Sequence, residues 1–169
     1  MWAATIAGVI SGSDHYAEGH GALDWKLVGL VRVVHADGPD ISRSSAERAD
    51  AEAVWVPTAL LPRCDVAWSA TDASHINARD HVEDKTVHVH YPLGDDGMIR
   101  SLVFDRWGDP DNTGTWGLHR FGGEITGCAT FDGMTLPGSG RLGWHYGTDR
   151  WSEGEFFRYH ITDLRFIHS

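Results

Sequence analysis

The sequence is poor in cysteine, in basic side chains and in long apolar runs, and each shortage excludes a class of protein. Two cysteines among 169 residues, Cys64 and Cys128, can form at most one bridge, which excludes the disulfide framework of a small secreted domain. Lys and Arg total 14 against 24 acidic residues, for a formal net charge of -10. Because phosphate backbones are bound mainly through Lys and Arg, we expect no nucleic acid partner.

No apolar run reaches the about 18 residues that a membrane-spanning helix needs, so we expect no stable membrane insertion. Residues 1–21 hold a short apolar patch without a basic segment before it, which is not the pattern of a signal peptide. We therefore expect a soluble, cytoplasmic protein, and leave open a natural chain that is longer at its N-terminus. CxxC, HExxH, GxSxG and phosphate-loop spacings are missing too, which predicts no cofactor, no structural zinc site and no serine hydrolase.

The chain does contain enough apolar side chain for one core, since 41 % of its residues are hydrophobic. Its length is that of one domain, which we assign to residues 1–169. Residues 22–35 are apolar and β-branched between turn-forming segments. This pattern predicts a strand or a bent pair of strands, with Gly29 at the bend.

The segment DISRSSAERADAEAVW predicts the main helix, because it is rich in alanine and Ser42 or Ser44 can cap its first turn. Glu47 follows Ser44 at the spacing of a capping box. The helix should end at Val56, because the proline that follows disfavours helical geometry in the residue before it. The TALL stretch beyond that proline allows one further turn.

Downstream of the helix, the pattern changes to short β segments separated by turn signals such as GDDG, FDGM and PGSG. Strands are expected at residues 66–69, 75–82, 86–93, 99–105, 124–131, 141–146 and 156–166. Strands so closely spaced favour an antiparallel meander, because parallel pairing needs longer crossovers. The predicted fold is α+β: a curled antiparallel β-sheet, or half-barrel, of about seven to nine strands, with one main helix packed across its concave face.

Histidines provide the one pattern that could bind a metal. In VHVHY, His88 and His90 are two residues apart and share a face of the predicted strand, and His81 could lie across the hairpin from them. Plain alternation in a half-exposed strand explains the same pattern, and we favour that interpretation. The prediction is therefore no metal, with these three histidines as weak candidates.

One face of the predicted helix combines charge with an aromatic ring. Arg48 and Glu52 are four residues apart and Trp55 follows three further on, so the three side chains share a stripe. If this face is exposed to solvent, the charges form an ordinary surface ion pair of little value. If it faces the curled sheet, they form a polar anchor in an apolar cavity. The sequence leaves both open.

The later strands and turns carry more aromatic rings than a small core needs, which favours a pocket with apolar walls and a few polar groups. The candidate wall residues in this region are Trp107, Trp116, Trp144 and Tyr159. Arg106 and Glu124 add charge where two predicted strands meet their loops. A single tryptophan on a strand is more often part of the core than of a site.

Three segments together resemble a known family: GPDISRSSAERADAEAVWVPTALLP, VFDRWGDPD and GWHYGTDRWSEGEFFRYHIT. The family is an uncharacterised one, a domain of unknown function well represented in actinobacteria, and the similarity runs from about Gly19 to Leu164. At the level of fold alone, the expected half-barrel is similar to the lipoprotein and lipid carriers that hold acyl chains. Fold does not fix function, and the missing export signal departs from those carriers.

Three functions follow as hypotheses. The first is binding of a small apolar or amphipathic molecule, with Arg48, Glu52 and Arg106 as polar anchors and the aromatic residues, including Trp55, as walls. The second is a metal-independent isomerase, cyclase or lyase in which Glu52 is the general base and Arg106 or Tyr146 stabilises negative charge. The third is a structural or protein-interaction module. Ligand, oligomeric state and strand register stay open at this point.

Overall fold

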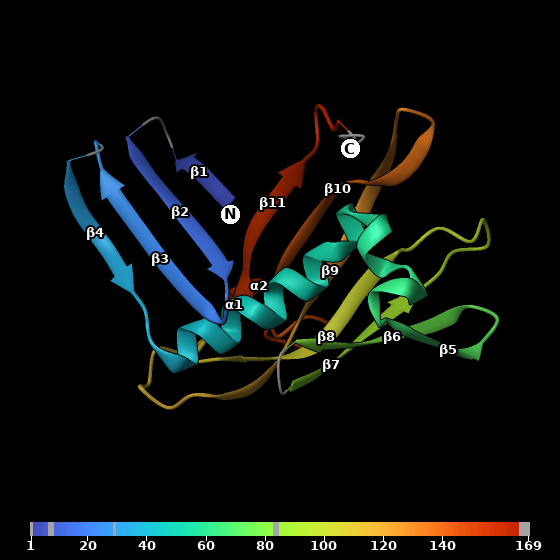
Figure 1. The fold of residues 1–169 in the computed structure, drawn as a ribbon, viewed down its shortest axis with the longest axis horizontal. Coiled ribbons are helices and arrows are strands. Elements are labelled where there is room, and N and C mark those ends of the chain that lie inside the picture. The colour runs from blue at the N-terminus through green and yellow to red at the C-terminus, as the bar shows by residue number, and fades with distance from the viewer. Residues whose placement is uncertain (1, 7–8, 29, 83–84, 166–169) are drawn as a thin grey trace.

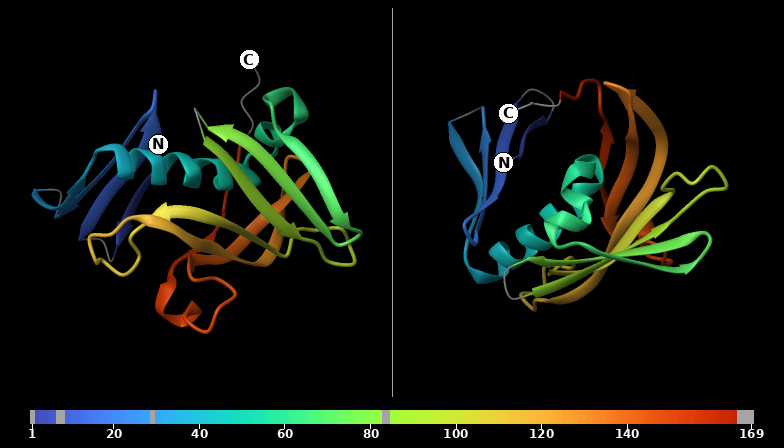
Figure 2. Two further views of the ribbon diagram at one scale, coloured as in Figure 1. Left: turned by 90° about the horizontal axis from the view of Figure 1, so that it is seen from below. Right: turned by 45° about the vertical axis from the view of Figure 1, so that its right-hand side comes forward.

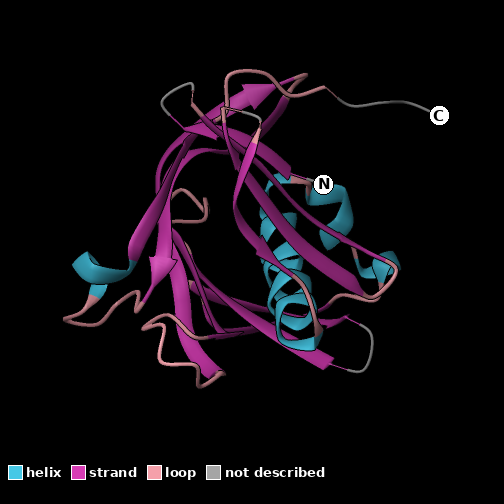
Figure 3. Ribbon diagram, turned by 90° about the vertical axis from the view of Figure 1, so that its left-hand side faces the viewer, coloured by secondary structure: helices cyan, strands magenta, loops and turns pink. Residues whose placement is uncertain are grey.

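The computed structural model describes residues 2–6, 9–28, 30–82 and 85–165, which form two antiparallel sheets with a helix between them (Figures 1 and 2). The small sheet has four strands in the order β1-β2-β3-β4, and the large sheet has seven in the order β11-β10-β9-β8-β7-β6-β5. The large sheet curls around helix α1 (Figure 3). The predicted α+β class, with a half-barrel of antiparallel strands and one main helix across its concave face, is confirmed.

The elements have the following bounds. The small sheet contains β1 (Trp2–Ile6), β2 (Ile10–Ala17), β3 (His20–Leu27) and β4 (Val31–Ala36). Helix α1 (Pro39–Ala51) continues directly into the 3-10 turn η1 (Glu52–Trp55), and two separate 3-10 turns follow, η2 (Pro57–Leu60) and η3 (Pro62–Cys64). The large sheet contains β5 (Ala67–Asp72), β6 (His75–Val82), β7 (Lys85–Pro92), β8 (Ser101–Gly108), β9 (Gly117–Phe131), β10 (Met134–Trp144) and β11 (Glu155–His160), with the short α2 (Trp151–Gly154) between the last two.

The small sheet extends the sequence prediction toward the N-terminus. Strands β3 and β4 pair antiparallel, which confirms the bent pair predicted for residues 22–35. Gly29, predicted at the bend, lies outside the described residues. Strands β1 and β2 were not predicted, because a short apolar patch does not by itself distinguish a strand from other structures.

The start of α1 differs from the prediction. Gly38 occupies the N-cap position without a side-chain hydrogen bond, and Pro39 begins the helix, so a serine cap is wrong. Proline suits this position because its fixed φ is already helical and its missing N–H would be unpaired anyway. Ser42 instead accepts a hydrogen bond from the backbone N–H of Gly21 (3.0 Å), and Ser44 is buried within the helix.

The end of the helix follows the prediction closely. Helical geometry continues from α1 through η1 to Trp55, and Val56 leaves it with φ -125° and ψ 70°. Leaving the helical region at this residue is what the following Pro57 requires. The further turn expected after the proline is present as the 3-10 turn Pro57–Leu60.

The later strands follow the predicted meander in number and order, but β9 and β10 begin seven residues earlier than predicted and β11 ends at His160 rather than at residue 166. The PGSG segment was predicted as a turn, and this is wrong: it lies inside β10. The register shifts twice there, between Pro137 and Ser139 and between Ser139 and Gly140. Strand β11 pairs with β10 only from Ser139 onward, so Pro137 lies where β10 is still an edge and its missing N–H is tolerated.

The hydrophobic core fills the space between α1 and the concave face of the large sheet. Its buried residues are Ala51, Val54, Val66, Ala78, Val87, Val89, Tyr91, Leu102, Phe104, Phe121 and Leu142. Both cysteines are free and exposed. Within the part of the chain that the structure describes, no helix has the length and apolar character to cross a membrane.

Candidate functional site

An apolar hollow opens where the last turn of α1 meets the concave face of β8 to β11. It encloses about 60 Å³ and is open to solvent on one side. Its walls are formed by Arg48, Ala51, Glu52, Trp55, Leu102, Phe121, Leu142, Phe156 and Phe157. A space of this size holds a few carbon atoms, so a larger molecule would lie partly in the opening.

A β-bulge brings two phenylalanines to the hollow. Leu142 pairs with Phe157, whereas the next residue of β10, Gly143, pairs with Glu155, so Phe156 is the extra residue. Regular alternation would send neighbouring side chains to opposite faces, and the bulge instead places both rings on the wall of the hollow. Phe156 is 62 % exposed, which is unusual for a large apolar side chain on a concave face.

The polar end of the hollow is a network of buried charges that joins the helix to the small sheet. Arg48 forms an ion pair with Asp14 on β2 and lies 3.3 Å from a carboxylate oxygen of Glu52. Asp14 is only 5 % exposed. The sequence analysis missed Asp14, because its partner is 34 residues away and a single aspartate in a strand gives no local signal.

Arg106 of β8 completes the charged network from the large sheet. Arg106 is only 9 % exposed, and its Nε donates a hydrogen bond to the carbonyl oxygen of Ser44 (3.2 Å). The guanidinium stacks over Phe121 and Trp144, at 4.7 and 5.0 Å from the ring centroids. Burial, and then the nearby Arg48 charge, lower the pKa of Arg106 to about 10. The group is still a cation at neutral pH.

Of these charged groups, Glu52 has the electrostatic environment best suited to exchanging a proton with a bound molecule. Burial raises the pKa of its carboxyl, the Arg48 charge opposes that shift, and the Asp14 charge reinforces it. A carboxyl with a raised pKa takes up a proton more readily near neutral pH than an exposed glutamate. It can donate a hydrogen bond when protonated, and when ionised it is a stronger base than usual.

Trp55 lines the hollow, whereas the predicted wall residue Tyr159 lies behind it and is not part of the lining. Their rings meet edge to face with centroids 4.8 Å apart. The Trp55 indole Nε1 and the Tyr159 hydroxyl are buried and make no hydrogen bond of good geometry to any residue the structure describes. Burial raises the pKa of Tyr159, so its hydroxyl is a donor rather than an anion.

The structure brings together part of the predicted site. Arg48, Glu52 and Trp55 line the hollow as one stripe of the helix and its first 3-10 turn, and Arg106 lies beside them. Trp144 packs edge to face on Phe121, with ring centroids 5.1 Å apart, and belongs with the core rather than with the lining.

Several of the predicted residues, in addition to Trp144, lie away from the hollow. Glu124 forms an ion pair with Arg141, which is next to the buried Leu142 and therefore points to the opposite, convex face of the sheet. Tyr146 packs on the ring of Trp151, with centroids 5.0 Å apart, in the segment after β10. Trp116 precedes β9 and does not line the hollow.

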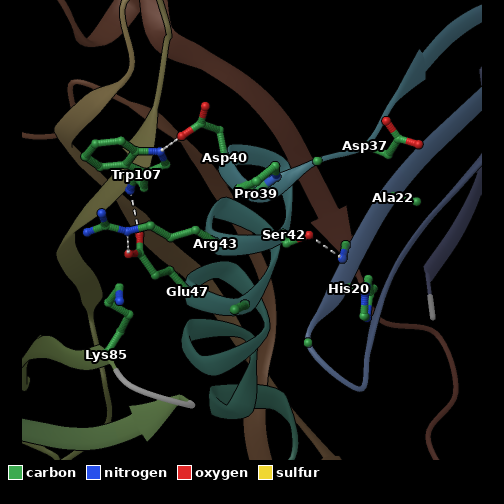
Figure 4. Close-up of a pocket in the computed structure, with 14 residues that line it drawn as sticks. His20, Ala22, Asp37, Pro39, Asp40, Ser42, Arg43, Glu47, Lys85 and Trp107 are labelled. Atoms are coloured by element: carbon green, nitrogen blue, oxygen red, sulfur yellow. Dashed lines mark hydrogen bonds and ion pairs between the residues drawn. The ribbon is translucent and has the colours of Figure 1, made fainter.

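Trp107 lines a different cleft, at the N-terminal end of α1 (Figure 4). Its indole Nε1 donates to Asp40 (2.8 Å), its backbone N–H donates to Glu47 (2.5 Å), and the Arg43 guanidinium lies 4.0 Å from the ring centroid. Arg43 also donates to Glu47 (2.9 Å). The cleft has a volume of about 880 Å³, and these polar groups are occupied by one another.

The candidate histidines are separated by their strand register. His81 pairs with Thr86 and His88 with Arg79, whereas His90 lies 2.7 Å from the side-chain oxygen of Asn77 and stacks on His75. Among the side chains described, no three His, Cys, Asp or Glu residues are placed to hold a metal ion.

Comparison with known proteins identifies a family. A model of the Family of unknown function (DUF6544) matches residues 1–156, so the chain belongs to that family. The resemblance expected from the three sequence segments is thereby confirmed, whereas the association with actinobacteria and the analogy with lipid carriers stay predictions. No curated protein and no solved structure matches the chain significantly.

Proposed function

We propose that the protein binds a small apolar or amphipathic molecule in the hollow between α1 and the large sheet. The observation that carries this proposal is an open hollow with aromatic and aliphatic walls that ends at buried charges. Pockets for small molecules are built in this way, with mostly apolar walls and a few polar groups that fix orientation.

The wall and its polar end define the ligand class. An apolar chain or ring would cover Phe156, which is otherwise left in water, and would pack on Phe157 and Leu142. A hydroxyl, amide or carboxyl group at the end of the molecule would meet Arg48 and Glu52. Together these groups offer guanidinium donors and a carboxyl that can donate or accept.

Binding is measured with the dye 1-anilinonaphthalene-8-sulfonate, displaced by straight-chain carboxylic acids and alcohols of increasing length. Phe156→Ser removes an exposed side chain, so the fold should be retained while affinity falls about tenfold, which corresponds to part of the free energy of burying one phenylalanine. Leu118→Ser is the matched control, because Leu118 is 56 % exposed on β9 and does not line the hollow.

Two outcomes would contradict the proposal. One is equal loss of dye and ligand binding in the Phe156 and Leu118 variants, which would mean that the dye reports general surface hydrophobicity. The other is retention of full affinity by Phe156→Ser with unchanged stability. Either result would favour a structural or protein-interaction role instead.

A second candidate function is favoured by the environment of Glu52. In this proposal Glu52 is the general base of a metal-independent isomerase, cyclase or lyase, and Arg106 stabilises the negative charge that develops on the substrate. Its raised pKa and its position on the hollow support the role. Tyr146, the alternative stabiliser, packs on Trp151 elsewhere and is the weaker choice.

Proton abstraction gives this second candidate its own assay. Small molecules that copurify with the protein are released, identified by mass spectrometry and incubated in D2O with fresh protein. Deuterium should enter the acidic carbon of the substrate with the original protein and not with Glu52→Gln, provided that both bind the compound equally. Equal deuterium uptake with both proteins would rule out Glu52 as the base.

A further inference from the structure

The small sheet has an apolar tip at the end that points away from α1 (Figure 1). The turn between β3 and β4 lies beside the start of β2, and the backbone N–H of Val28 donates to the carbonyl oxygen of Val9 (2.5 Å). The large aliphatic residues exposed here are Val9, Leu27, Val28, Leu30, Val31 and Val33. We refer to these six residues as the tip.

Exposure and backbone geometry at the tip are both unusual. Leu30 is 86 % exposed and Val28 is 66 % exposed, and side chains of this kind are normally scattered singly on a surface rather than gathered. Val28 also has φ 53°, a left-handed conformation that a β-branched residue rarely adopts. An asparagine or glycine would suit that turn better, so folding alone does not explain this valine.

The charge around the tip is opposite to that of the rest of the chain. Residues 2–13 contain no charged side chain, and residues 25–34 contain only Lys26 and Arg32, although the chain as a whole has 24 acidic residues. Lys26 and Arg32 face each other across β3 and β4. Lys26 Nζ lies 3.8 Å and Arg32 Nε 3.1 Å from a carboxylate oxygen of Asp24. The three side chains together therefore carry one positive charge in excess.

We infer that the tip docks on the surface of an anionic lipid bilayer. Aliphatic side chains on a protruding turn can enter the boundary between headgroups and acyl chains, while basic side chains just behind them remain at the level of the headgroups. The acidic remainder of the protein is held away from the membrane by the same field. This attachment is peripheral and reversible, and it does not depend on the proposed ligand site.

The charge pattern favours lipid over a second copy of this chain. Two tips brought together would place the Lys26 and Arg32 side chains of both copies close to one another, and like charges at an interface oppose association. An anionic headgroup layer complements the positive charge of Lys26 and Arg32 and covers the six aliphatic residues of the tip at once.

The test is cosedimentation with vesicles of phosphatidylglycerol and phosphatidylcholine, in comparison with vesicles of phosphatidylcholine alone. The original protein should bind the anionic vesicles more tightly, and salt should weaken that preference. The double variant Val28→Asn with Leu30→Ser should bind at least about tenfold more weakly, because two aliphatic side chains no longer enter the interface. Asparagine tolerates the left-handed conformation, so this variant should fold.

Control variants distinguish lipid docking from self-association and from nonspecific adsorption of apolar surface. Lys26→Gln with Arg32→Gln should abolish the preference for anionic vesicles, and Leu118→Ser should bind as the original protein does. The inference is overturned if the original protein does not sediment with vesicles, or if Leu118→Ser loses as much binding as the tip variant. It is also overturned if analytical ultracentrifugation shows a dimer that the tip variant breaks. The ligand displacement assay, performed without lipid, is unaffected by any of these results.

Discussion

Replacing Asp14 by asparagine tests whether the buried charge network holds the two sheets and the helix together. The substitution keeps the shape of the side chain and removes its charge. Asp14 forms an ion pair with Arg48, and both side chains are largely buried, with 7 and 16 % exposure. In the variant, Arg48 loses the Asp14 charge and keeps its contact with Glu52, with 3.3 Å between Nε and a carboxylate oxygen, while the Arg106 cation remains near enough to repel it.

The expected loss is about 3 kcal/mol in the free energy of unfolding, at the lower end of the range for breaking a buried ion pair from one side, because Glu52 still compensates part of the Arg48 charge. For a chain of this length that corresponds to a melting temperature lower by roughly 10 °C. The Asp14 charge also raises the pKa of Glu52, so the variant should show a lower Glu52 pKa. Urea denaturation measures the first effect, and NMR titration of the labelled carboxyl measures the second.

A double variant decides whether the network explains the loss. Asp14→Asn with Arg48→Met removes both charges, and burial of an apolar side chain in place of an ion pair is often neutral or stabilising. The double variant should therefore be more stable than Asp14→Asn alone. If Asp14→Asn is as stable as the original protein, or if the double variant is less stable than the single one, the reasoning about the network is refuted.

Two further predictions concern α1 and its neighbours. Burial, together with the hydrogen bond and charge of Asp80, raises the pKa of Asp50 from 3.8 to about 8, so the folded state retains a proton that the unfolded state releases. The free energy of unfolding should therefore fall as pH rises from about 4 to 8. The slope should be a fraction of the limiting value of about 1.4 kcal/mol per pH unit, because the carboxyl is partly solvated. Urea denaturation at several pH values should show a weaker pH dependence of this free energy for Asp50→Asn than for the original protein. Gly21→Ala would place a Cβ 2.8 Å from Ser42 Cα, so it should lower stability by about 1–3 kcal/mol, whereas Gly117→Ala, with 3.5 Å to its nearest neighbour, should not.

Local signals in the sequence predict much of this fold. The helix is encoded by a run of good helix formers that ends ahead of Pro57, and the structure leaves helical geometry at Val56. The meander follows from closely spaced turns, and the stripe of Arg48, Glu52 and Trp55 follows from helical spacing alone. These features depend on residues within a few positions of one another, which is why a single sequence is enough to find them.

The remaining features depend on contacts between distant segments. Asp14 reaches the network only because β2 packs against α1, and no local pattern marks it. Phe156 enters the hollow because of a bulge, and a change of one residue in register reverses which side chains face inward. Trp144 and Glu124 were assigned to the site by residue type, whereas pairing places the first in the core and the second opposite Arg141 on the convex face.

The charged network itself is an argument for a site rather than for a purely structural interior. A core is stabilised at least as well by packed apolar residues as by buried ion pairs, so Asp14 and Arg48 are a poor choice for stability alone. They lie at the polar end of an apolar hollow, beside a glutamate whose pKa they modulate in opposite directions. Stability and ligand binding should therefore separate in the double variant: Asp14→Asn with Arg48→Met should recover stability and still bind the displacing carboxylic acids more weakly. Recovery of both properties would mean that the charges serve the fold alone and that the hollow needs only its apolar walls.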